Sequence, residues 1–366
     1  MPAASTKSSS LVIDKASEQS DAVLALLKGI QDEYGLDAAQ RLDSDGLSIH
    51  IPGVVSTGSE WLDWALGRGG VAMSRITLVS GNEGAGKTTL CLHLVAAVQK
   101  MGGVAFYVDA EYKLDLDYAI ALGVDANQMI LSQPKTVEGA FAVIDKACDV
   151  VTTMRLKTGK DVPTLIILDS YSALPAMVEV AVGKDKYGKD KNPAGKQHPG
   201  AQARAISEQL RAITGKLSKS HIALVLISQE RIVFAGGAGN GATTTGGNAP
   251  RFYAAVIVSL EAAGFEKDGD EKIGRMTQVK VEKNQVGPPF RKCNLLLNYG
   301  KGIDYVHSLH HAVKAMFPEA VNGTWVHFAG LKWQGEQQLK QLIEDDPGNL
   351  ADVQTELRAR YGWDAE

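Results

Sequence analysis

The chain has 366 residues, of which 45% are hydrophobic and 22% are charged, and its formal net charge is -4. This length suits one large α/β domain with smaller appendages, and the charge balance means that any nucleic-acid surface must come from local clustering of basic residues. We expect neither an export signal nor a membrane span, because residues 1–10 are polar and no run of about 18 apolar residues occurs. The three cysteines lie in apolar segments without C-x-x-C spacing, which indicates reduced core residues of a cytoplasmic protein.

The N-terminal region contains one predicted helix after a lead that looks disordered. From Asp21 to Tyr34 apolar residues recur at helical spacing. A helix this short is not stable alone, so its apolar stripe needs a partner surface, either on its own domain or on a neighbouring subunit. We favour the neighbour. Residues 51–67 then combine a Ser/Thr/Gly turn with a short helix, for which Ser59 is the predicted N-cap.

Residues 81–89, GNEGAGKTT, fit the phosphate-loop pattern G-x-x-x-x-G-K-[ST], with an apolar run on either side to supply a strand and a helix. Glycines let backbone N–H groups turn toward an anion, and the start of a helix adds a positive dipole. Lys87 would reach the β- and γ-phosphates of ATP, and the Thr88 hydroxyl would hold Mg²⁺. The alternative is a glycine-rich turn that binds nothing. The predicted nucleotide-binding residues of the loop are Gly81, Asn82, Glu83, Gly84, Ala85, Gly86, Lys87, Thr88 and Thr89.

Short β-branched runs alternate with helical patterns from the phosphate loop to about Tyr299. This alternation predicts an α/β fold with a mostly parallel twisted sheet covered on both faces, and the later, closely linked strands predict an antiparallel extension. We expect three regions: 1–50, a lead with an oligomerisation helix; 51–304, the core; and 305–366, a small α+β lobe. The predicted strands are Ile76–Val79, Val104–Val108, Thr164–Leu168, Ala223–Ile227, Ala255–Leu260, Met276–Val281 and Asn294–Leu297.

Three polar residues follow predicted strands and would share one edge of the sheet. Asp169 ends a buried run, where a Walker-B aspartate holds Mg²⁺; the alternative is a helix cap. Glu111 could polarise the attacking water, or simply place a charge at a helix N-terminus. The amide of Gln229 can donate or accept, which suits a sensor of the γ-phosphate.

The chain resembles the RecA family of homologous-recombination ATPases over about Val55 to Gly362. The resemblance is carried by STGSEWLDWALGRGG at 56–70, the phosphate loop, YVDAEYKLDLDYAIALGVD at 107–125, LSQP at 131–134, ILDSYSAL at 167–174, TTTGGNAPRFYA at 243–254 and YGKGI at 299–303. It implies a RecA-type core and an ATP-dependent recombinase that forms helical filaments on single-stranded DNA, pairs homologous duplexes and exchanges strands in repair.

The resemblance also implies residue roles. Glu111 is the expected catalytic glutamate, Gln229 the γ-phosphate relay, and Lys283 stabilises the γ-phosphate of a neighbouring subunit. Phe252 and the 21–34 helix would pack across the subunit interface. The adenine contacts would be Asp115, Tyr118 and Tyr299.

Two segments align with the family's DNA-binding loops. The first is locally basic, which suits phosphate contacts, although a solvated surface insertion is the alternative. The second is rich in Gly, Asn and Thr, so it cannot pack a core, and its ordering on DNA would act as a switch directly after Gln229. The expected DNA-binding residues are Lys184, Lys186, Lys189, Lys191, Lys196, Arg204, Arg211, Arg231, Phe234, Asn240, Thr243, Thr244, Thr245, Gly246, Gly247 and Asn248.

The sequence departs from the common bacterial pattern in several places. Gln285 stands where many relatives have a second lysine, the phosphate loop lacks the usual Pro and Ser, and the acidic tail is missing. These departures are compatible with a phage-encoded member, and the cytoplasm would then be that of the bacterial cell or phage-infected host. Loading or mediator proteins are further expected partners.

Two other functions share the phosphate loop. A ring helicase or repair accessory motor would translocate on DNA, whereas a small-molecule kinase would use neither of the two DNA loops. A metal site is not expected at His307, His310 and His311, because no Cys or carboxylate stands at ligand spacing, and we expect partly exposed helix residues there. Trp325, Phe328 and Trp333 are expected in the core of the C-terminal lobe.

Overall fold

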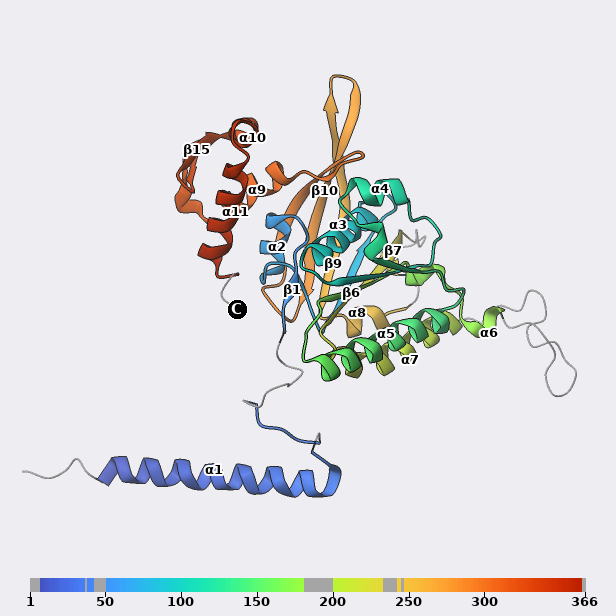
Figure 1. Cartoon of the computed structure of the whole chain (residues 1–366), viewed down its shortest axis with the longest axis vertical. Helices are drawn as coiled ribbons and strands as arrows, with labels where there is room; N and C mark the ends of the chain where they lie inside the picture. The colour runs from blue at the N-terminus through green and yellow to red at the C-terminus, as the bar shows by residue number, and fades with distance from the viewer. Residues whose placement is uncertain are drawn as a thin grey trace, which may run out of the picture. The chain divides into compact units, whose positions relative to one another are not determined.

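A computed structural model describes residues 7–36, 38–42, 51–180, 200–232, 242–244 and 247–363 (Figure 1). Side chains of residues 7–19, 230–232 and 242–244 are outside this description. The chain divides into two compact units, residues 1–50 and residues 51–366. None of the described helices is both long enough and apolar enough to cross a bilayer.

The first unit contains α1 (Lys7–Tyr34), whose apolar residues Val23, Leu24 and Leu26 are all about half exposed or more. The expected helical segment is therefore present, but it begins at Lys7 and not near Asp21. The expectation of a disordered lead was wrong from residue 7 onward. Residues 7–20 contain neither Gly nor Pro, so nothing in them stops the helix from extending backward.

The second unit is built on a ten-stranded mixed sheet, and this confirms the predicted α/β fold class. Its strand order is β12-β11-β10-β9-β3-β7-β6-β4-β5, and β8 pairs with β7. The six strands from β9 to β5 run parallel, and β9 to β12 form the predicted antiparallel extension. The strands are β3 (Ile76–Gly81), β4 (Val104–Asp109), β5 (Met129–Ser132), β6 (Thr164–Asp169), β7 (Ile222–Ile232), β8 (Ala242–Thr244), β9 (Val256–Asp268), β10 (Glu271–Asn284), β11 (Lys292–Asn298) and β12 (Gly302–Ile303).

Helices cover both faces of this sheet because successive strand residues point to opposite sides. Val79 and Ile167 pack with α2, α3 and α4, whereas Leu78 and Ile166 pack with α5 and α7 (Figure 1). The helices of this region are α2 (Glu60–Leu66), α3 (Lys87–Lys100), α4 (Leu116–Ala121), α5 (Val137–Thr158), α6 (Met177–Val180), α7 (Ala201–Leu217) and α8 (Ala249–Tyr253), with short 3₁₀ turns at Ala126–Gln128 and Tyr171–Ala173. The strands β1 (Val54–Val55) and β2 (Val71–Ala72) form a small separate pair.

The predicted N-cap of α2 is confirmed. The Ser59 side chain accepts a hydrogen bond of 3.2 Å from the Leu62 N–H, and Gly67 ends the helix with a φ of 86°. In the same turn, the buried Asp63 carboxylate accepts from Ser56 Oγ and from the backbone and hydroxyl of Thr57 at 2.6–2.8 Å. The start of the 56–70 motif therefore forms a hydrogen-bonded polar turn that leads into α2.

The C-terminal residues have a hydrophobic cluster of their own, and Trp61 of α2 packs against it. Trp333 and Phe328 are buried there as expected, but Trp325 is only partly buried under Lys332. The elements are α9 (Tyr305–Met316), a 3₁₀ turn at Pro318–Ala320, β13 (Val321–Asn322), β14 (Trp325–Phe328), β15 (Leu331–Gln334), α10 (Gly335–Asp345) and α11 (Gly348–Tyr361).

The expectation for the three α9 histidines was wrong at two positions. His307 and His310 are buried, and only His311 is partly exposed. The reason is that α9 packs between α2 and the C-terminal cluster, so that two of its faces are covered.

Candidate active site

The phosphate loop joins the buried strand β3 to α3 in the strand–loop–helix order that the motif requires. Gly81 has a φ of 152° and Gly86 a φ of 93°, which are backbone conformations that favour glycine. Side chains at these positions would also collide, at Gly81 with the Leu260 carbonyl oxygen and at Gly86 with Leu297. The loop therefore depends on its glycines both for its path and for its packing.

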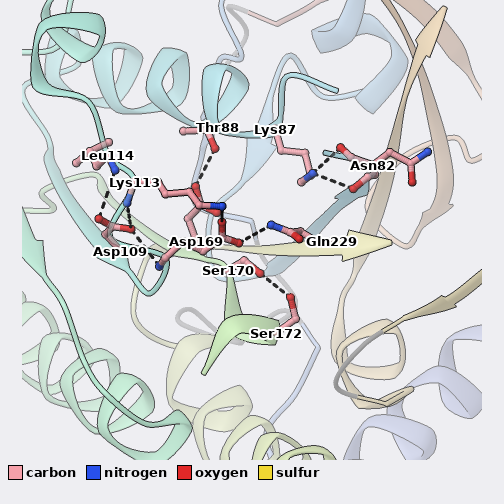
Figure 2. A network of polar contacts seen from close by, with 12 residues as sticks. Asn82, Lys87, Thr88, Asp109, Lys113, Leu114, Asp169, Ser170, Ser172 and Gln229 are labelled. Atoms are coloured by element: carbon pink, nitrogen blue, oxygen red, sulfur yellow. Dashed lines mark hydrogen bonds and ion pairs between the residues drawn. The ribbon is translucent and has the colours of Figure 1, made fainter. Parts of the chain in front are cut away.

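Lys87 is the first residue of α3 and is only 8% exposed. Its Nζ donates to the carbonyl oxygens of Gly81 and Asn82 at 2.8 Å each, so its ammonium group lies within the curve of the loop (Figure 2). A buried cation at a helix N-terminus is suited to a polyphosphate, because both the charge and the helix dipole attract anions.

Asp169 ends β6 and meets the phosphate-loop helix directly. Thr88 Oγ1 donates to Asp169 Oδ2 at 2.9 Å (Figure 2). The Tyr107 hydroxyl donates to the same oxygen at 2.7 Å. Burial raises the pKa of the Asp169 carboxyl above its ordinary value, although both hydrogen bonds oppose that shift. A buried carboxylate oxygen beside a hydroxyl oxygen fits the hard oxygen ligands that Mg²⁺ prefers.

Glu111 and Gln229 lie in contact. Gln229 Nε2 donates to Glu111 Oε1 at 2.6 Å, and Lys113 Nζ approaches Glu111 Oε2 at 3.0 Å. The Glu111 side chain is 14% exposed, so this carboxylate is largely screened from bulk water. Gln229 is paired with Gly81 in the register of β7 against β3, which places the amide beside the phosphate loop.

The sequence did not single out Lys113 or Asp109. The Asp109 carboxylate is buried and accepts from the backbone N–H groups of Glu111, Lys113 and Leu114 at 3.2–3.4 Å (Figure 2). It therefore shapes the turn that carries Glu111. The signal for this role was the VDAE run itself, since an Asp can accept hydrogen bonds from backbone groups two residues on.

The phosphate loop, Asp169, Glu111 and Gln229 line one cavity of about 260 Å³. These residues lie at or near the carboxyl ends of the adjacent strands β3, β7, β6 and β4, which meet at one edge of the sheet. Its lining consists of Glu83, Gly84, Gly86, Lys87, Thr88, Thr89, Glu111, Lys113, Asp169 and Gln229.

None of the three residues expected at adenine is among the residues that line this cavity. Asp115 caps α4 by accepting from the Tyr118 N–H at 2.9 Å, and the Tyr118 hydroxyl bonds with Thr89 Oγ1 at 2.9 Å. Tyr299 follows β11 and is 52% exposed. Tyr118 is thus held next to the phosphate-loop helix, and Tyr299 offers a free ring face.

Most of the expected DNA-binding residues lie outside the described residues: Lys184, Lys186, Lys189, Lys191, Lys196, Phe234, Asn240, Thr245 and Gly246. For Arg231, Thr243 and Thr244 the backbone alone is described, in the antiparallel pairing of β7 with β8. Arg204 and Arg211 are both exposed on α7, and Asn248 precedes α8.

The ends of the two loop segments lie close together. The first segment leads into α7 at Gly200, and the second returns at Gly247. A side chain built on Gly247 would lie 3.0 Å from Ala203 of α7. Both segments therefore return to the same part of the surface.

Phe252 and Lys283 also lie together. Lys283 Nζ donates to the backbone carbonyls of Arg251 and Phe252 at 3.2 and 3.1 Å, and the Phe252 side chain is highly exposed. Burial lowers the pKa of Lys283, and the charge of Arg251 adds to this. Lys283 does not line the phosphate cavity of its own chain.

Strand order, phosphate loop and carboxylate positions together define a P-loop nucleoside triphosphatase. Comparison with known proteins is more specific. The model of the RecA N-terminal domain family matches residues 21–304. Protein RecA of Brucella canis is 37% identical over 358 residues, covering 97% of this chain and 93% of that protein, and Protein RecA 2 of Myxococcus xanthus is 35% identical over 346 residues, covering 94% and 91%.

The chain therefore belongs to the RecA family of DNA strand-exchange recombinases. Members of this family are DNA-dependent ATPases that use ATP with Mg²⁺, bind DNA and form filaments. The comparisons give no support to the helicase or accessory-motor alternative.

Proposed function

We propose that this chain assembles as a helical filament on single-stranded DNA, and that ATP in the 260 Å³ cavity controls its grip on the strand. The observation that carries the proposal is the 2.6 Å hydrogen bond from Gln229 to Glu111. Glu111 belongs to the hydrolytic site, whereas Gln229 belongs to β7, the strand that continues into the second DNA segment.

The site residues have separate tasks in this proposal. Lys87 and the N–H groups of the loop bind the triphosphate, and Thr88 with Asp169 would hold Mg²⁺, which neutralises charge on the phosphates. Glu111 orients and deprotonates the attacking water, and Asp109 fixes the turn that presents it. Tyr118 and Tyr299 would offer aromatic faces to the base, with Asp115 as the polar contact.

The route to DNA runs through β7. Gln229 lies three positions before Ile232, the last residue of β7, and β8 pairs back onto residues 230–232. If Gln229 turns from Glu111 toward a γ-phosphate, the β7–β8 ribbon must follow, because backbone pairing makes it one unit. The ribbon returns at Gly247 beside α7, where Arg204 is positioned to contact a phosphate backbone.

Filament assembly requires two surfaces, and we assign both. An apolar groove of about 420 Å³ lies along the edge strand β5 and α5, and its lining includes Ile130, Val150 and Met154. These three side chains are 44–55% exposed, and we infer that α1 of the neighbouring subunit covers them. Phe252 and Lys283 form the second surface, from which Lys283 would act on the γ-phosphate of the next subunit.

The proposal is tested on oligo-dT with an ATP analogue, with ADP and without nucleotide. We expect filaments in electron micrographs and tight binding only with the analogue, and strand exchange between homologous duplexes with ATP. Equal DNA affinity in all three nucleotide states would refute nucleotide control. Closed rings that unwind duplexes would refute the recombinase assignment itself.

A further inference from the structure

The second site of interest lies in the C-terminal part of the chain. His307 and His311 stand one turn apart on α9, and Glu336 is the second residue of α10. His307 Nδ1 lies 3.1 Å from both carboxylate oxygens of Glu336, and His311 Nε2 lies 3.0 Å from Oε1. One ligand atom from each of these residues lies within 4.8 Å of the others.

This spacing suits a metal ion. Ligands of a tetrahedral Zn²⁺ at about 2.0–2.1 Å from the metal stand about 3.3 Å from one another. The three nitrogen–oxygen separations of 3.0–3.1 Å are therefore a few tenths of an ångström from those of a coordination sphere. Each imidazole would bind the ion as the neutral ring, with its single proton on the other ring nitrogen and any second proton released to solvent.

The group formed by His307, His311 and Glu336 is packed against Trp61 on one side and is exposed to solvent on the other. The Trp61 ring stacks on the His311 ring with centroids 4.6 Å apart and an interplanar angle of 13°. The His307 side chain is 6% exposed, whereas those of His311 and Glu336 are 30% and 38% exposed. An ion can thus enter from solvent, and a water molecule can complete its coordination.

The choice of coordinating atom on His307 is also fixed. Its Nε2 is buried and has no hydrogen-bond partner within the described residues, whereas Nδ1 faces the carboxylate. Helix α9 is further anchored to the core, because Ser308 Oγ bonds with Ser59 Oγ at 2.8 Å. The ligands therefore project from a supported helix.

We propose that His307, His311 and Glu336 bind one divalent transition-metal ion, with Zn²⁺ favoured. Two imidazole nitrogens and one carboxylate oxygen match Zn²⁺ and its first-row neighbours, whereas Mg²⁺ and Ca²⁺ prefer an all-oxygen set. The ion would link α9 to α10 across 25 residues of chain, from His311 to Glu336, and would fix the Trp61 ring between the core and the C-terminal cluster. Its role is structural, and it does not depend on the proposed control of DNA binding.

The first experiment uses the full-length protein, stripped of metal and kept in excess Mg²⁺ so that the oxygen ligands of the phosphate site are occupied. Zn²⁺ is titrated in competition with a chromophoric chelator, and Co²⁺ is added in parallel as a spectroscopic substitute. We expect one Zn²⁺ per chain, a higher thermal midpoint with Zn²⁺, and visible absorption bands typical of four- or five-coordinate Co²⁺. Absence of both binding and bands in the wild-type chain overturns the proposal without recourse to any variant.

Variants then locate the site. Glu336→Gln should weaken Zn²⁺ binding at least about tenfold, the smaller end of the loss caused even by outer partners of metal ligands. Glu344→Gln on the same helix and His327→Ala on β14 remove exposed residues of the same kinds and should bind Zn²⁺ like the wild type. Metal-free melting curves check that each variant folds. Equal Zn²⁺ affinity in Glu336→Gln and Glu344→Gln would show that His307, His311 and Glu336 form hydrogen bonds with one another but no metal site.

Discussion

At the scale of single residues, the proposed role of Glu111 in water activation rests on two contacts of its carboxylate. Gln229 donates to one of its oxygens and the Lys113 ammonium pairs with the other, so both oxygens of the carboxylate are held in position. Both partners line the same cavity as Lys87 and Thr88. A base held in this way should govern turnover more than nucleotide affinity.

Glu111→Gln should retain nucleotide and DNA binding but slow DNA-dependent hydrolysis about 100-fold or more, because an amide cannot accept the proton of water. Phosphate release with single-stranded DNA measures turnover, and a fluorescent ATP analogue measures binding. Glu344→Gln is the control, since Glu344 is an exposed carboxylate on α10 and does not line the cavity. Undiminished turnover would remove Glu111 from the mechanism.

His93 provides a pH-dependent prediction. It lies on α3, and its Nε2 accepts a hydrogen bond of 2.9 Å from the Ile303 N–H of β12. Burial first, and then the charge of Lys100, lowers the pKa of His93 from 6.5 to about 4. The unfolded chain therefore binds a proton on acidification before the folded chain does, so this residue's contribution to stability is lost as pH falls from 6.5 toward 4.

We expect acidification from pH 7 to pH 5 to cost about 2 kcal/mol of stability through His93. His93→Gln should flatten this part of the pH profile, because an amide oxygen can accept from Ile303 without titrating. Thermal unfolding at several pH values measures the difference between the two chains, and His327→Gln, at an exposed histidine, is the control. Parallel pH profiles for wild type and His93→Gln would contradict the prediction.

The sequence located residues with local signals and missed those that depend on packing. Lys87 and Thr88 follow from a motif, and Asp169 from a buried run that ends in a carboxylate. Glu336 was missed because it meets His307 and His311 only after β13, β14 and β15 have turned the chain back. No helical or strand period links positions 25 or more residues apart.

At the scale of elements, β7 is both a core strand and the start of a DNA segment. Its first half is buried between β3 and β6, and its end pairs with β8. Gln229 lies at the junction of these halves. A change in its partner can therefore reach the second segment without any change in the core.

Gln229→Asn tests this coupling. The shorter side chain keeps the amide but withdraws it by about one C–C bond, so the contact with Glu111 should be lost. We expect ATP binding to persist, while the ratio of DNA affinities with ATP analogue and with ADP falls toward one. Fluorescence anisotropy on labelled oligo-dT measures both affinities, with Gln128→Asn at an exposed site as control. If the ratio of the two DNA affinities is unchanged in Gln229→Asn, then Gln229 does not couple the nucleotide to DNA binding.

The strands could be predicted from the sequence where their burial produces runs of apolar residues. The six later predicted strands all occur, but β9 and β10 continue well beyond Leu260 and below Met276 into an exposed hairpin that projects from the sheet (Figure 1). Residues 261–273 of this hairpin are exposed, so they lack the apolar alternation that marks a half-buried strand. Backbone pairing extends the two strands there, together with the Lys272 ammonium, which lies 3.9 Å from the centre of the Phe265 ring.

At the scale of the whole molecule, the proposed function uses one sheet twice, for catalysis at its strand ends and for assembly at its edge. Within the described residues, β5 pairs only with β4, so its other edge is available. The adjoining groove is apolar, and the apolar residues of α1 are exposed within their own unit. Two complementary surfaces on different parts of one chain give a head-to-tail contact, and an open helix results when that contact does not close.

Met154→Glu tests this assembly. Met154 lines the groove and is 52% exposed, so a glutamate there would place a charged carboxylate against the apolar residues of α1 of the neighbour. We expect assembly to require about 30-fold more protein, equivalent to about 2 kcal/mol per contact. Light scattering with ATP analogue and oligo-dT measures assembly, while ATP binding by the isolated chain should be unchanged.

Leu156→Glu is the control that makes this test specific. Leu156 lies on the same helix and is 77% exposed, but it does not line the groove. A general loss of solubility or helix stability would affect both variants. Loss of a docking surface in the groove would weaken assembly only in Met154→Glu. Equal assembly by the two variants would exclude the groove, and the interface would then have to be sought at another face. Leu26→Glu on α1 should reproduce the Met154→Glu defect, because it places the same charge on the opposite side of the contact.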